Sequence, residues 1–70
     1  MKITVETKLA TTISGEATYF GNSTIALDVT ELSAAKAEVL FNEGATLQKY
    51  GDCWHVQIAR RLIQKYELVD

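Results

Sequence analysis

The sequence predicts an α+β fold in which a small antiparallel sheet packs with two helices. Three observations support this class: strand-like alternation at the start of the chain, an alanine-rich helical segment in the middle, and helical spacing near the end. The 70 residues suffice for a single domain, residues 1–70, and 47% hydrophobic with 23% charged residues is typical of a globular chain. A domain of this size has a thin core.

The first part of the chain predicts a three-stranded antiparallel meander. Apolar and polar residues alternate as they do in strands with one buried face, over residues 2–9, 12–20 and 24–29. The turn-forming run Gly21-Asn22-Ser23 separates the last two of these strands. Tyr19 keeps the phase of the apolar set in its strand and Phe20 falls out of phase with it, so either Phe20 or Tyr19 is exposed at the strand end, and Phe20 is a candidate contact residue.

A helix is expected at about residues 32–43. Thr30 or Ser33 can supply the N-terminal cap, the alanines that follow are strong helix formers, and Gly44 can end the helix in a left-handed conformation.

This helix carries two apolar stripes where a helix on one sheet needs only one. The first consists of Ala34, Ala37, Leu40 and Phe41, and the second of Leu32, Ala35 and Val39. The second stripe either packs under the C-terminal segment or faces a partner.

Residues 45–59 allow two interpretations. As a β-hairpin, the segment turns at Gly51-Asp52 and returns with three apolar residues on one buried face, Trp54, Val56 and Ile58. As helices, residues 46–66 resemble a helix-turn-helix whose outer helix faces DNA. The strand-phased apolar trio and the Gly-Asp turn favour the hairpin, and the helical alternative stays open.

The last segment predicts an amphipathic helix at about residues 58–68. Its apolar residues fall within one arc at helical spacing: Ile58, Ala59, Leu62, Ile63, Tyr66 and Val69. A strand would instead mix Arg, Leu, Gln, Tyr and Leu on one face. No residue between positions 56 and 60 supplies a good N-terminal cap for this helix.

The charge distribution indicates one basic surface on an acidic body. The net charge is −2, and residues 1–52 carry four lysines against seven acidic residues. A typical nucleic-acid binder is basic, so DNA is the less favoured partner. The predicted outer helix face gathers the contact candidates, with both arginines projecting into solvent: Arg60, Arg61, Gln64 and Lys65. We expect this face to meet an acidic patch on another protein, and the secondary contact candidates are Leu32, Ala35, Val39 and Phe20.

No catalytic, cofactor-binding or metal-binding residue is predicted. Cys53 and His55 would share a face of a strand, but Asp52 lies in the turn and cannot orient the histidine. A structural zinc site takes four ligands, and the chain has one cysteine and one histidine.

Together these patterns predict a small non-enzymatic protein-binding module. Free-standing proteins of this size often act as stoichiometric inhibitors or accessory factors from phage or mobile elements, and we expect such a role. Two alternatives stay open: a DNA-binding protein using residues 46–66, and a homodimeric or stabilising subunit of a larger complex. The chain shows no signal-peptide core and no run of about 20 apolar residues, so a cytoplasmic location without membrane contact is expected.

Overall fold

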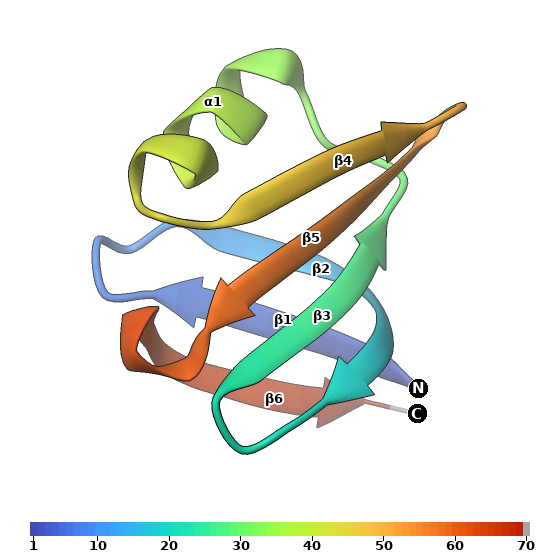
Figure 1. Cartoon of the computed structure of the whole chain (residues 1–70). Helices are drawn as coiled ribbons and strands as arrows, with labels where there is room; N and C mark the ends of the chain where they lie inside the picture. The colour runs from blue at the N-terminus through green and yellow to red at the C-terminus, as the bar shows by residue number, and fades with distance from the viewer. Residues whose placement is uncertain (70) are drawn as a thin grey trace.

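Six antiparallel strands and one α-helix make up residues 1–69, the part of the chain that the computed structural model describes (Figure 1). The strands are β1 (Lys2–Thr7), β2 (Thr12–Phe20), β3 (Thr24–Val29), β4 (Thr46–Tyr50), β5 (Cys53–Ala59) and β6 (Ile63–Val69). Helix α1 (Ala34–Asn42) lies between β3 and β4, and a 3-10 turn, η1 (Arg60–Leu62), joins β5 to β6. A small antiparallel sheet with one helix is an α+β arrangement, as the sequence predicts.

The sheet has the order β4-β5-β3-β2-β1-β6 and folds over on itself, so that β4, β5 and β3 lie in front of β1 and β6 in Figure 1. The long strand β2 forms the corner, because residues 12–16 pair with β1 and residues 16–20 pair with β3. Gly15 lies at this corner, where a Cβ atom would come within 2.1 Å of the carbonyl oxygen of Asp28. The close approach of β3 therefore requires glycine at this position.

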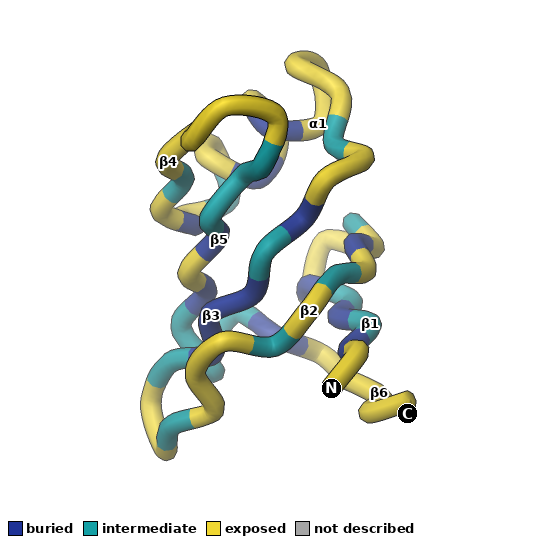
Figure 2. The backbone as a smooth tube through the Cα atoms, turned by 90° about the vertical axis from the view of Figure 1, so that its right-hand side faces the viewer, coloured by how far each residue is buried: buried dark blue, intermediate teal, exposed yellow. Residues whose placement is uncertain are grey.

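The core fills the space between the two halves of the folded sheet. Its members come from the inner faces of the strands, and α1 adds one fully buried side chain, Leu40. The largest fully buried side chains are Ile3, Val5, Ile25, Leu27, Leu40, Val56 and Ile58. Figure 2 shows buried positions along β1, β3 and β5. Strand β6 is buried only at its first residue and is exposed from there to its end.

The three predicted N-terminal strands and the central helix are confirmed, with the helix shorter than the predicted 32–43. Ser33 caps α1, because its Oγ accepts a hydrogen bond from the backbone N–H of Lys36 over 3.1 Å. Gly44 follows the helix with a φ of 109°, a conformation that favours glycine.

The hairpin interpretation of residues 45–59 is also confirmed, and the helical interpretation is wrong. Strands β4 and β5 pair from Tyr50 opposite Cys53 to Thr46 opposite Gln57. Val56 and Ile58 are fully buried, and Trp54 is partly buried against the core.

The predicted C-terminal helix at 58–68 is wrong. Residues 58 and 59 end β5, residues 60–62 form η1, and residues 63–69 form β6 along β1. The strand phase is reset twice, once by η1 and once by a bulge that leaves Gln64 without a directly opposite residue on β1. Because of these two resets, apolar residues of two strands fall at spacings that imitate a helix.

A second bulge corrects the phase predicted for β2. The register with β3 shifts between Ala17 and Tyr19, so Phe20 and not Tyr19 lies opposite the buried Ile25. Tyr19 is turned outward and is exposed.

Candidate protein-contact surface

Three side chains from different elements form an aromatic–arginine cluster at one end of the folded sheet: Phe20 from β2, Arg60 from η1 and Tyr66 from β6. The rings of Phe20 and Tyr66 meet edge to face with centroids 5.1 Å apart. The guanidinium carbon of Arg60 lies 4.4 Å from the Phe20 centroid and 5.4 Å from that of Tyr66. Both rings remain about 40% exposed, at 40% and 42%, so the cluster is a surface feature.

Arg60 is fixed in this cluster by its backbone and its side chain. Its Nε donates to the carbonyl oxygen of Gly21 over 2.5 Å, and its backbone N–H donates to the carbonyl oxygen of Ser23 over 2.9 Å. These bonds attach η1 to the β2–β3 turn. The expectation that both arginines project into solvent therefore holds for Arg61, which is exposed, and not for Arg60, which is partly buried.

Three of the four predicted contact residues lie close together, although no α-helix carries them. Arg60, Gln64 and Lys65 line one shallow depression of about 350 Å³ together with Ile63 and Tyr66. Lys65 also makes an ion pair across the ladder, with its Nζ 3.6 Å from Oε1 of Glu6 on β1. Among residues 1–69, neither arginine forms an ion pair with a carboxylate.

The secondary stripe on α1 does not form one surface. Leu32 is partly buried against the core, whereas Ala35 and Val39 are exposed beside the β1–β2 loop. Val39 and Phe41 are 48% and 66% exposed, so the helix buries Ala37 and Leu40 and little else. The explanation that the stripe packs under the C-terminal segment is wrong, because that segment is β6, at the opposite edge of the sheet from α1 (Figure 1).

The two edges of the sheet differ in how they are covered. Helix α1 packs against the edge strand β4, as Figure 1 shows. Strand β6 forms the opposite edge, and its last six residues are all exposed. An uncovered edge of this length is open to pairing with another strand.

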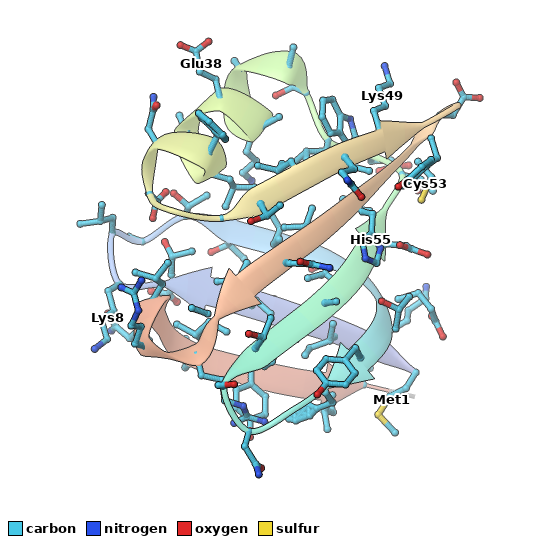
Figure 3. All side chains as sticks on the ribbon, in the orientation of Figure 1. Met1, Lys8, Glu38, Lys49, Cys53 and His55 are labelled. Atoms are coloured by element: carbon cyan, nitrogen blue, oxygen red, sulfur yellow. The ribbon has the colours of Figure 1, made fainter. Side chains whose placement is uncertain are left out.

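Cys53 and His55 project from the outer face of β5 on the same side of the molecule (Figure 3). The Nδ1 of His55 lies 2.9 Å from Oδ1 of Asp28 on β3, the residue directly opposite it. The sequence did not indicate this carboxylate, because only the pairing of β3 with β5 brings the two residues together. The Sγ of Cys53 contacts the carbonyl oxygen of Trp54 at 3.9 Å.

Within residues 1–69, no group of three or more His, Cys, Asp or Glu side chains is arranged to hold a metal ion. The single helix of this part of the chain is too short to cross a membrane. Protein-family models, curated proteins and solved structures gave no match to this chain.

Proposed function

We propose that this chain is a small non-enzymatic protein-binding module that places its aromatic–arginine cluster against an acidic patch of another protein. Gln64 and Lys65 line the same depression as Arg60 and Tyr66, and with the exposed Arg61 of η1 they complete the proposed contact surface. The observation that carries the proposal is the fixed position of Arg60 against two partly exposed rings. Binding of this kind suits a stoichiometric inhibitor or accessory factor.

The chemistry of the cluster matches that of residues that dominate protein interfaces. Arginine and tyrosine are enriched among residues whose truncation costs the most binding energy. A guanidinium presents a planar fork of donors that fits a carboxylate with two hydrogen bonds. Because Arg60 is already held by the rings and by Gly21, little side-chain entropy remains to be lost on binding.

The charge of the whole domain favours a protein over DNA. Residues 1–52 carry four lysines against seven acidic residues, so their field opposes the approach of a polyanion. An acidic protein patch can be bound at short range, where the geometry of the arginine fork matters more than net charge. The described structure of residues 46–66 consists of strands and a 3-10 turn, so it offers no recognition helix for a major groove.

The proposal is tested by identifying the partner and then measuring how its affinity depends on the cluster. The partner is captured from a lysate of the native host and identified by mass spectrometry. Arg60→Lys keeps the charge but removes the planar fork, and Arg61→Glu reverses an exposed charge. Each should weaken binding by about 1–2 kcal/mol, which is roughly tenfold in affinity.

Lys36→Glu is the matched control, because it reverses an exposed charge on α1 instead. We expect it to leave the affinity within about twofold, a difference well below 1.4 kcal/mol. Thermal unfolding of each variant separates loss of binding from loss of folding. If neither arginine variant weakens binding, the contact surface lies elsewhere. Sub-micromolar binding to duplex DNA at physiological salt, falling steeply as salt rises, would support the DNA-binding alternative.

A further inference from the structure

Strand β6 carries a second binding feature, its backbone edge, which adjoins the aromatic–arginine cluster at Tyr66. We propose that the uncovered edge of β6 pairs antiparallel with β6 of a second copy of this chain, about a two-fold axis at Tyr66. The two sheets then continue into each other. Three observations lead to this inference: the free edge, the direction of its backbone groups, and the order of its charged residues.

The hydrogen-bond phase of the ladders decides which backbone groups of β1 point towards β6. The N–H of Ala17 donates to the carbonyl oxygen of Met1 over 2.8 Å, which makes Lys2 and Glu16 a non-hydrogen-bonded pair in the β1–β2 ladder. A second bond, from the N–H of Thr7 to the carbonyl oxygen of Thr11 at the other end of the same ladder, has the same phase. Lys2, and every second residue after it on β1, therefore directs its backbone groups towards β6.

The same alternation continues on β6. Lys2 lies opposite Val69, and the register holds without a shift back to Lys65. Val69, Glu67 and Lys65 thus bond to β1, whereas Tyr66 and Leu68 direct their N–H and C=O groups to the uncovered edge. A two-fold axis at Tyr66 places these free groups opposite those of the second copy, as a hydrogen-bonded antiparallel pair requires.

The charges of β6 select this register. With the axis at Tyr66, Lys65 of one copy lies opposite Glu67 of the other, and the same pair forms again across the axis. An axis at Lys65 would oppose two lysines, and an axis at Glu67 would oppose two glutamates. Opposite charges on directly facing residues stabilise antiparallel strands, whereas like charges destabilise them. The Lys65 side chain is 75% exposed, so it can reach across the edge while it remains near Glu6.

The other edge of the sheet lacks these properties. Strand β4 is contacted by α1, and its one charged residue is Lys49, which lies over the Trp54 ring. Two copies of β4 could therefore form no pair of opposite charges. The dimer is specific to β6.

The test uses charge reversal on the two residues that face each other. Lys65→Glu alone places glutamates opposite each other at positions 65 and 67 of the two copies, and Glu67→Lys alone places lysines opposite each other there. Each variant should raise the dimer dissociation constant at least about tenfold, because two facing pairs become repulsive at once. An equimolar mixture of the two variants restores both attractive pairs in the mixed dimer, so its dissociation constant should return to within about threefold of the wild type. Sedimentation velocity of the full chain, from about 1 µM to about 500 µM, measures all four samples.

The mixture distinguishes pairing across β6 from an effect on folding, because a folding defect in either variant would persist in the mixture. Glu38→Lys, an exposed reversal on α1, serves as the control and should leave the dissociation constant unchanged. A wild-type protein that stays monomeric over this range overturns the inference. So does a dimer that neither reversal weakens, or one that the mixture fails to restore. The inference does not depend on the proposed partner, since a monomeric chain that still captures a partner through Arg60 contradicts the dimer alone.

Discussion

Arg60 joins three segments of the molecule: its backbone N–H and its Nε both bond to the β2–β3 turn, and its guanidinium lies over the rings of Phe20 on β2 and Tyr66 on β6. The sequence identified Arg60 and Phe20 as contact candidates but assigned them to separate surfaces. Tyr66 was expected in a helical core. Their meeting depends on a bulge in β2 and on the path of β6, and neither feature has a short-range signal in the sequence.

Trp54 shows how partial burial limits the energetic effect of a large residue. It packs against the core, and the Nζ of Lys49 lies 5.4 Å from its ring. We expect Trp54→Ala to lower the free energy of unfolding by about 3 kcal/mol, the lower end for such substitutions, because part of the ring already contacts solvent. Urea unfolding monitored by circular dichroism provides the measurement.

Tyr50→Ala is the matched control on the same hairpin. Its ring is 63% exposed, so the expected change is within about 0.5 kcal/mol. Equal losses for the two variants would contradict the view that Trp54 is held by the core.

At the scale of elements, the sequence predicted what local periodicity encodes. Strands β1, β2 and β3, helix α1 and the β4–β5 hairpin each follow from alternation, a capping residue or a turn signal. Strand β6 could not be predicted in this way, because η1 and the bulge at Gln64 shift its phase twice within a few residues. Its strand conformation is fixed by pairing with β1 at the other end of the chain, and this long-range contact overrides the local pattern.

The corner in β2 can be tested through Gly15. A Cβ atom there would overlap the carbonyl oxygen of Asp28, and a backbone atom in a paired strand cannot move aside without loss of pairing. We expect Gly15→Ala to destabilise the domain by about 1–3 kcal/mol, the range for overpacking. The shift in the urea midpoint measures this loss.

Gly21→Ala provides the comparison. The nearest atoms to its added Cβ belong to the exposed side chain of Tyr19, which can rotate away. This variant should lose at most about 0.5 kcal/mol. A Gly15→Ala variant as stable as Gly21→Ala would show that β2 can bend without glycine.

At the scale of the whole molecule, the two ends of the described chain lie side by side, because β1 and β6 pair antiparallel (Figure 1). Lys2 lies opposite Val69, and η1 is held to both halves of the sheet. The N–H of Arg60 bonds to the β2–β3 turn, and the carbonyl oxygen of Leu62 accepts a bond from the N–H of Lys8 at 2.9 Å. The order of strands in the sheet thus depends on contacts between residues far apart in the sequence, which residue patterns do not specify.

The neighbouring ends also make the chain suitable for circular permutation. A short flexible linker could join the ends, and new ends could be opened in the exposed turn after Gly51, where a Cβ atom would meet nothing within 4 Å. The β1–β6 pair, which is the most distant pairing in the natural order, would then become a local hairpin. Because domains with lower contact order fold faster, we expect the permutant to refold several-fold faster than the natural chain, with stopped-flow Trp54 fluorescence as the measurement. Slower refolding would show that closure of the ends does not limit folding, and that the β4–β5 hairpin divided by the new ends has to form first.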